Sequence, residues 1–333
     1  MKPPDYFEKV QRSAQETWAL LDSKREIAGP WHQMFNQVQY PRVILSELLQ
    51  NADDAGAKRA SVTFVDGVFT FEHDGADFTE DQFASLCRFG FSNKRSLHTI
   101  GFRGIGFKST FSLGDAVEVL SPTLAVSFHR RRFTEPRWLE SATSSTSTIV
   151  RVSVADKNRA NQLKGSLAEW SESPSSLLFF KNLRELSIDG TVVRKRVTKH
   201  GPVERSQFLN LTGEETERLF FVQSEAETLP EDAAEEVRSE RGLTDLEDLH
   251  LPPCEIEIVL GLKAPQRLYV VLPTGAEIPV PFSINAPFIQ DPARMKIKDP
   301  ATSPTNRWLL ERTGRLLAQT LLDWVGNKDL TLA

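Results

Sequence analysis

Apolar residues between positions 41 and 55 recur with the spacing of one helical face. Proline stands at the first position, where helices tolerate it, and Gly56 follows the last, where glycine commonly ends a helix. The residues of the apolar side are Leu45, Leu48, Leu49 and Ala52. The pattern predicts a helix over 41–55 that buries this side against a sheet.

Two stretches of alternating apolar and polar residues have the sequence of β-hairpins. They span 61–71 and 183–197, and each contains an Asp-Gly pair, which suits a type I′ turn. Shorter apolar or alternating runs predict three more strands, at 117–120, 124–128 and 148–154. This part of the chain therefore favours antiparallel strands.

Two further helices are expected among these strands. One begins at Thr79, whose hydroxyl can form a capping box with Gln82, and ends near Gly90. The other covers 156–170. Helices and antiparallel strands mixed in this way indicate the α+β class.

The pattern changes after an acidic stretch at 214–248, which we interpret as a solvated connection that carries short elements. Beyond it, apolar runs predict further strands and a long amphipathic helix, at 255–260, 267–271, 278–284 and about 306–325. The chain has 333 residues, which is longer than a domain with a single hydrophobic core usually is. We therefore expect a first domain at 1–205 and a smaller α/β unit at 206–333.

Composition and charge exclude several classes of protein. The chain has 40% apolar residues, 26% charged residues and a formal net charge of -5. It therefore offers no overall positive field for phosphate backbones or anionic membranes. No apolar run approaches the ~20 residues of a membrane span, and Cys87 and Cys254 form no CxxC pair that would indicate a zinc site. We expect a cytoplasmic protein without membrane contact.

Two short basic clusters, at 129–132 and 194–196, leave a local nucleic-acid surface open as an alternative. Charges of this kind on alternating strands are more often a solvated face. The six histidines show no metalloprotease spacing, and no Gly-x-Ser-x-Gly stretch indicates a serine hydrolase. Other residues therefore have to carry the chemistry.

Three polar residues share one side of the helix predicted at 41–55. Glu47, Asn51 and Asp54 stand at i, i+4 and i+7, opposite the apolar side. Taken alone, such a triplet is usually a solvated helix face. Three polar groups aimed at one place also suit a site that holds a ligand.

A glycine-rich stretch at 101–106 reads Gly-Phe-Arg-Gly-Ile-Gly and leads into Phe107 and Lys108. Backbone N–H groups exposed there could hold phosphate oxygens at the start of a helix. The stretch is not a Walker A loop, because Phe107 separates the last glycine from the lysine. It is not a Rossmann loop either, because the glycine spacing is reversed.

Three motifs occur in a defined order along the chain. They are Glu47-Leu48-Leu49-Gln50-Asn51-Ala52-Asp53-Asp54-Ala55, Asp74-Gly75 and Gly101-Phe102-Arg103-Gly104-Ile105-Gly106-Phe107. This set resembles the motifs of the GHKL ATPases, which have a Bergerat fold. It is most similar to the sacsin-like and Hsp90-like domains of bacterial ATP-binding proteins. The second motif departs from the family's usual Asp-x-Gly-x-Gly, since Ala76-Asp77 follows here.

The resemblance implies a fold and a ligand. The fold is a two-layer α/β sandwich, with a mixed, mostly antiparallel sheet and helices on one face. The ligands are ATP and Mg²⁺. The resemblance covers roughly residues 40–155 well and the remainder more loosely.

The resemblance also assigns roles to residues of the first two motifs. Glu47 becomes the general base for the attacking water, and Asn51 becomes the Mg²⁺ ligand. Asp54 supports the metal's shell or a water near the base. Asp74 accepts a hydrogen bond from the adenine amino group, and Gly75 lets the backbone approach the ring.

The third motif and two more distant cations complete the expected site. The nucleotide-binding residues of the third motif would be Gly101, Gly104, Ile105, Gly106 and Phe107. Lys94 lies where the family has a mobile lid, and could meet phosphate charge or belong to a solvated basic loop. Arg294 lies in a stretch similar to the one with which Hsp90-like proteins present an arginine to the γ-phosphate. Lys296 and Lys298 are the alternates, and a plain surface arginine is the competing interpretation.

Together these inferences favour an ATPase in which binding and hydrolysis of Mg·ATP switch a lid and the two domains between open and closed states. The products would be ADP and phosphate. The expected partner is a protein client, a partner subunit or a second copy of the chain. Two alternatives remain open: an ATP-gated regulatory module with negligible turnover, and a DNA-processing GHKL ATPase, which the acidic net charge disfavours.

Overall fold

The computed structural model describes residues 1–37, 41–88, 106–143, 145–212, 219–242, 251–291 and 296–326. These residues form two units. The first takes the described residues up to 174 together with 180–193, and the second takes 175–179 and the described residues from 194 on. The chain changes unit inside strand β8 (Thr191–His200), whereas the boundary expected from the sequence is at 205.

The sheet of the first unit is mixed and mostly antiparallel. Its strands follow one another in space as β7 (Glu185–Ile188), β1 (Arg59–Val65), β2 (Val68–His73), β6 (Thr148–Ser153), β3 (Ala116–Leu120), β4 (Ala125–His129) and β5 (Arg132–Trp138). Of the pairings between these described strands, that of β1 with β7 is parallel and the others are antiparallel. The α+β class expected from the sequence is confirmed.

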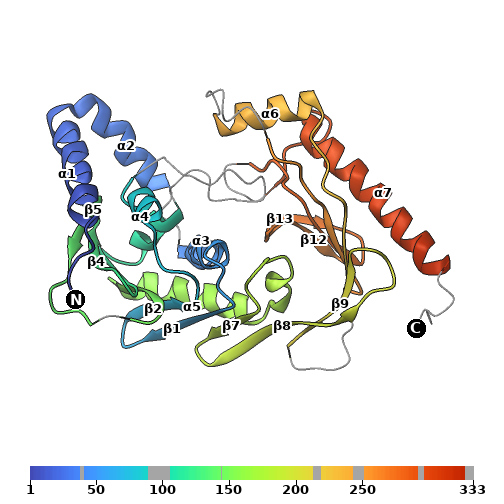
Figure 1. Cartoon of the computed structure of the whole chain (residues 1–333), viewed down its shortest axis with the longest axis horizontal. Helices are drawn as coiled ribbons and strands as arrows, with labels where there is room; N and C mark the ends of the chain where they lie inside the picture. The colour runs from blue at the N-terminus through green and yellow to red at the C-terminus, as the bar shows by residue number, and fades with distance from the viewer. Residues whose placement is uncertain are drawn as a thin grey trace. The chain divides into compact units, whose positions relative to one another are not determined.

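Helices α3 (Pro41–Asp54) and α5 (Lys157–Ser171) lie together on one face of this sheet (Figure 1). Strands β1 and β2 bury the side chains of that face in alternation: Ala60, Val62, Phe69, Phe71 and His73. On the other face, a row of polar residues runs across four strands through the directly opposed positions Thr63, Thr70, Arg151 and Glu118. One buried and one polar face make this unit two-layered.

Local sequence signals explain several turns and helix ends. Asp66 and Gly67 have φ of 51° and 78°, and Asp189 and Gly190 have 45° and 88°, so both Asp-Gly pairs adopt the left-handed conformation of a type I′ turn. Thr79 and the third residue after it form the expected capping box at the start of α4 (Glu80–Leu86). This helix ends at Leu86, earlier than the end predicted near residue 90, which lies outside the described residues.

The sequence did not predict the two helices before residue 41 or strand β5. Helices α1 (Phe7–Ser23) and α2 (Arg25–Gln37) meet β5 through aromatic contacts. The rings of Phe35 and Phe133 stack at 4.0 Å, and Trp18 Nε1 donates to Thr134 Oγ1 at 3.0 Å. These contacts join segments about a hundred residues apart, so no local pattern reveals them.

The strands of the second unit also pair mostly antiparallel. Its strands follow one another as β13 (Leu272–Ile278), β12 (Gln266–Val270), β14 (Phe282–Asn285), β11 (Glu257–Leu260), β10 (Leu219–Gln223), β9 (Ser206–Leu211) and β8. Its buried cluster contains Leu178, Phe179, Leu209, Leu211, Leu219, Phe221, Val259 and Tyr269. Strand β10 and helix α6 (Glu231–Arg241) are the short elements carried by the acidic stretch 214–248.

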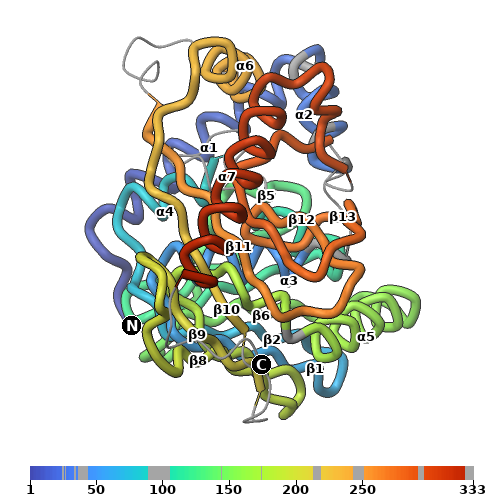
Figure 2. The backbone as a smooth tube through the Cα atoms, turned by 90° about the vertical axis from the view of Figure 1, so that its right-hand side faces the viewer, coloured from blue at the N-terminus to red at the C-terminus, as the bar shows by residue number. Residues whose placement is uncertain are grey.

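Helix α7 (Pro304–Gly326) is the long helix predicted at 306–325, and its first turns lie beside α6 (Figure 1 and Figure 2). Its Arg312 is 2% exposed and attaches the helix to the chain around β10. The guanidinium donates to Glu227 Oε1 at 3.0 Å, Cys254 O at 3.0 Å, Ser224 Oγ at 3.1 Å and Glu225 O at 2.7 Å. This one side chain satisfies the buried carbonyl of Cys254 and three part-buried acceptors that follow β10.

Both cysteines are buried and neither forms a disulfide, in agreement with the sequence. No helix within the described ranges combines the length and the apolar run needed to cross a bilayer.

We predict that Arg312→Leu lowers the free energy of unfolding of the chain by about 2–4 kcal/mol, because the buried carbonyl of Cys254 and the part-buried acceptors that follow β10 lose their donor. Urea denaturation measures this change. Arg315→Leu, an exposed arginine one turn further along α7, is the matched control and should stay within about 0.5 kcal/mol. Equal effects of the two substitutions would contradict the anchoring role.

Candidate nucleotide site along helix α3

The polar side of α3 is graded in exposure from one end to the other. Glu47 is 5% exposed, Asn51 is half-buried and Asp54 is exposed. Leu45, Leu48, Leu49 and Ala52, on the apolar side, are fully buried. Glu47 is therefore buried inside the first unit, whereas Asp54, the last residue of the helix, is exposed to solvent.

Glu47 lies against Gly106, the last glycine of the third motif. A Cβ added to Gly106 would overlap Oε2 of Glu47 and would come within 2.8 Å of its Cδ. Gly106 begins a 3₁₀ helix, η2 (Gly106–Ser112), which packs on α3 where the sequence indicated a helix start. A side chain at position 106 would force the end of Glu47 to move, so the first and third motifs meet at this contact.

Gly75 packs at the C-terminal end of the same helix. A Cβ added there would lie 2.9 Å from both Cβ and O of Ala55 and 3.0 Å from Nδ1 of His73. The next residue, Ala76, donates its N–H to the Ala55 carbonyl at 2.8 Å. The second motif is therefore attached to the C-terminal end of α3.

These two contacts define a candidate site along the helix. Glu47, Asn51 and Ala55 are successive members of an i, i+4 series, so they follow one side of α3. At 1.5 Å per residue, the two glycine contacts are separated by about 12 Å along the axis. Asn51 stands between them.

Asp74 has a structural role that the sequence did not reveal. Its Oδ1 accepts the backbone N–H groups of Lys58 and Arg59, both at 2.8 Å, and Oδ2 accepts Arg59 Nε at 3.1 Å. Burial raises the pKa of this carboxyl, but the bonds from Arg59 and Lys58 outweigh burial and leave the pKa below its ordinary value. Asp74 thus fixes the start of β1, while its expected contact with adenine remains a prediction.

His73 was not assigned a role from the sequence. It is 7% exposed, and its Nδ1 accepts the N–H of Gly75 at 3.1 Å. Burial lowers its pKa to about 4, although the charges of Asp74 and Glu72 act in the opposite direction. The alternation along β2 could have placed this histidine on the helix-facing side.

Asp53 is a second buried carboxylate of the first motif, besides Glu47, and the sequence analysis did not select it. Its Oδ1 accepts the N–H groups of Asn182 at 2.7 Å and Leu183 at 2.8 Å, and its Oδ2 accepts that of Lys181 at 3.1 Å. It therefore holds the chain before β7 against α3. Asp54, which the sequence favoured, projects to solvent instead.

Lys108 follows the third motif and is 1% exposed. Its Nζ donates to Leu86 O, at the end of α4, at 2.5 Å and lies 5.1 Å and 5.2 Å from the ring centres of Phe107 and Phe128. Burial lowers the pKa of this amine to about 8. Lys108 therefore attaches η2 to α4, while Phe107 is buried beside it.

Several predicted site residues lie outside the described residues: Lys94, Gly101, Gly104, Ile105 and Arg294. Their roles remain predictions.

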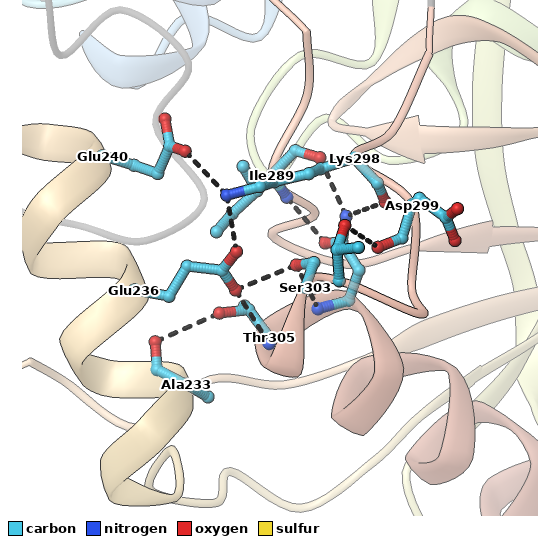
Figure 3. A network of polar contacts seen from close by, with 10 residues as sticks. Ala233, Glu236, Glu240, Ile289, Lys298, Asp299, Ser303 and Thr305 are labelled. Carbon is cyan, nitrogen blue, oxygen red and sulfur yellow. Dashed lines mark hydrogen bonds and ion pairs between the residues drawn. The ribbon is translucent and has the colours of Figure 1, made fainter.

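Lys298, an alternate to Arg294, is engaged by two carboxylates of α6. Its Nζ lies 2.9 Å from Glu236 Oε1 and 3.1 Å from Glu240 Oε1 (Figure 3). Hydrogen bonds to these carboxylates raise the pKa of the amine. The backbone of the other alternate, Lys296, pairs with that of Asp291, whose N–H donates to Lys296 O at 2.9 Å. Lys298 is therefore the less suitable of the two for a phosphate.

Asn306, in the first turn of α7, holds both ends of the segment that contains Arg294 in the sequence. Its Oδ1 accepts the N–H of Ile289 at 2.8 Å, and its Nδ2 donates to Ile289 O at 2.9 Å and to Lys298 O at 2.8 Å. The segment therefore begins and ends at defined positions on the second unit.

Three residues of the two basic clusters make contacts within the structure. Arg130 pairs with Asp115 at 2.9 Å, Arg132 pairs with Asp22 at 2.8 Å, and Lys195 is buried and donates to Leu178 O at 3.0 Å. The nucleic-acid alternative stays a prediction.

The donor set of α3 is compatible with Mg²⁺ bound together with phosphates. Among the residues that the structure describes, no group of three His, Cys, Asp or Glu side chains could hold a metal ion by itself. Mg²⁺ takes few protein ligands and completes its shell with water and substrate phosphates. One half-buried amide oxygen, that of Asn51, suits this mode of binding.

No protein-family model matches the sequence, and no curated protein matches it.

We predict that Gly106→Ala lowers the free energy of unfolding by about 1–3 kcal/mol, since its Cβ would displace the Glu47 carboxylate. Gly165→Ala, in α5, meets nothing within 4 Å and should instead stabilise the chain by about 0.5–1 kcal/mol. Urea denaturation of both variants, and of Gly106→Ala combined with Glu47→Ala, tests the contact. The double variant should lose less stability than the sum of the single ones. Strict additivity would show that the two residues do not meet.

We predict that His73 makes stability fall with acid. A buried histidine with a pKa near 4 stays neutral while its unfolded counterpart, near 6.5, takes up a proton. Stability is therefore fully present above pH 6.5 and falls by roughly 3 kcal/mol between pH 7 and pH 4. His73→Asn should remove this part of the slope, measured by urea denaturation at several pH values, and the exposed control His129→Asn should not. Identical slopes for the wild type and His73→Asn would contradict the prediction.

Proposed function

We propose that this chain binds Mg·ATP along α3 and hydrolyses it to ADP and phosphate, as a GHKL ATPase of the Bergerat type. The observation that carries the proposal is the contact of Glu47 with Gly106. It brings a buried carboxylate from the first motif to the glycine that ends the third. The two-layer first unit, with helices on one face of a mostly antiparallel sheet, has the architecture that the proposal requires.

The two ends of the site suit different parts of a nucleotide. The glycine-rich motif that ends at Gly106 would hold the phosphates through backbone N–H groups, next to the start of η2. The end at Gly75, where the backbone lies close to α3, would receive the base. Asn51, between them, would hold Mg²⁺, which when bound neutralises phosphate charge.

Glu47 would act as the general base. In the proposed step its carboxylate takes a proton from water, the water oxygen bonds to the γ-phosphorus, and the bond from that phosphorus to the β-phosphate oxygen breaks. ADP leaves with its terminal oxygen charged, and inorganic phosphate is the other product. A buried carboxylate is suited to this role because few waters compete for it.

Arg294 would contribute charge stabilisation from the second unit. Lys298, held between Glu236 and Glu240, is less available for this role, and Lys296 is the remaining alternate. An arginine that meets the γ-phosphate only when the two units close would affect turnover more than affinity.

We predict that Glu47→Gln leaves Mg·ATP affinity within about threefold of wild type and lowers phosphate release by ~10²-fold or more, the scale of a lost general base. Titration calorimetry measures the affinity and a phosphate assay measures turnover. Glu16→Gln, at an exposed position on α1, is the matched control and should change neither.

The other possible outcomes of these two measurements each favour a different interpretation. Wild-type chain that binds no Mg·ATP would overturn the proposal. Binding with no phosphate release in the wild type would support the ATP-gated regulatory module instead. Loss of affinity in Glu47→Gln equal to the loss of rate would give this residue a structural role.

A further inference from the structure

We infer that Gln50 orients the attacking water, with its Oε1 accepting one hydrogen of that water while Glu47 takes the other as a proton. The inference rests on the proposed function, because it names a second catalytic residue for the same reaction. Its evidence is the position, the burial and the bonding of Gln50, none of which depends on the contact between Glu47 and Gly106.

The first observation is that Gln50 and Glu47 lie on the same side of α3. Three residues of an α-helix advance by about 4.5 Å and turn by roughly 300°, so the two side chains are only about 60° apart around the axis. Their Cβ atoms are therefore about 5–6 Å apart. A glutamate and a glutamine at this spacing can hold one water molecule between the ends of their side chains.

The second observation is that Gln50 is as deeply buried as the proposed base. It is 6% exposed and Glu47 is 5% exposed. Gln50 nevertheless lies on the side of the helix away from the leucines that pack on the sheet, and glutamine is a residue type that is mostly exposed. Both members of the pair are therefore withdrawn from bulk water.

The third observation is an unpaired oxygen. Within the ranges that the structure describes, Oε1 of Gln50 is shielded from solvent and accepts no hydrogen bond. Asp53, three residues further on, is also buried, but its carboxylate accepts three backbone N–H groups. Buried oxygens are normally paired, because an unpaired one lowers stability. The oxygen of Gln50 is therefore available to a donor that is not part of the chain, and a buried water with several polar partners is such a donor.

The chemistry requires an acceptor of this kind beside the base. The attacking water has two hydrogens, of which the Glu47 carboxylate removes one. When Gln50 Oε1 accepts the other, the water can no longer rotate, and a lone pair of its oxygen is directed at the γ-phosphorus. The second hydrogen stays on the oxygen that becomes part of inorganic phosphate, so Gln50 remains unchanged. A neutral amide suits this position, since a second carboxylate there would oppose ionisation of Glu47.

Gln50→Met tests the inference, because methionine has a similar length and no comparable acceptor. We expect phosphate release to slow by about tenfold or more while the Mg·ATP affinity measured by calorimetry stays within about threefold of wild type. The urea midpoint should equal or exceed that of wild type, since no buried oxygen is left unpaired. The matched control is Gln162→Met, at an exposed position on α5, which should change none of the three measurements.

A double variant tests whether Gln50 acts on the same water as Glu47. Residues that act as a unit in one step have non-additive effects on the rate. We therefore expect Gln50→Met to slow phosphate release by less than about twofold when Glu47→Gln is already present. Losses that multiply in the double variant would show that the two residues act separately, and would overturn the inference.

The remaining outcomes separate this inference from the proposed function. Wild-type turnover in Gln50→Met, or a loss of affinity as large as the loss of rate, would overturn the role of Gln50 and leave the proposed function intact. Gln50→Asn, which withdraws the amide by one methylene, should show the same split between rate and affinity and serves if the methionine variant does not fold. A wild-type chain that binds no Mg·ATP would instead overturn the proposed function.

Discussion

The contact between the Glu47 carboxylate and Gly106 is the constraint on which the candidate site depends. Helix α3 can present a glutamate there because its opposite side is fully buried against the sheet, which fixes the rotation of the helix. The glutamate then needs a neighbour without a side chain. A second glycine, Gly75, meets the C-terminal end of the same helix, where an added Cβ would overlap Cβ and the carbonyl oxygen of Ala55. Helix α3 therefore connects motifs that are separate in the sequence.

Much of the fold could be predicted because its signals are local. The helix at α3, the two Asp-Gly hairpins and the capping box of α4 each depend on residues within a few positions of one another. The same holds for α5 and for the long helix α7. Strand β5 and helices α1 and α2 could not be predicted, because their stability comes from distant aromatic partners such as Phe133.

The residues of the candidate site also differ in how far the sequence could predict them. Glu47 and Gly106 could be selected from their motifs, and the structure brings them together. Two polar residues that support the site, Asp53 and Lys108, were missed because their roles depend on backbone groups far along the chain. His73 was missed although its partner, the N–H of Gly75, lies two residues away. Asp53 binds the segment before β7, and Lys108 binds the end of α4. Asp74 shows the converse case, since a residue selected for ligand chemistry also serves the backbone of β1.

A crystal structure of the chain with Mg²⁺ and a non-hydrolysable ATP analogue tests the central claim most directly. The proposed site predicts a triphosphate beside Gly106 with the γ-phosphate facing Glu47, and an adenine ring at the Gly75 end of α3. A nucleotide bound away from α3, or one with its phosphates at Gly75 and its base at Gly106, would contradict the claim.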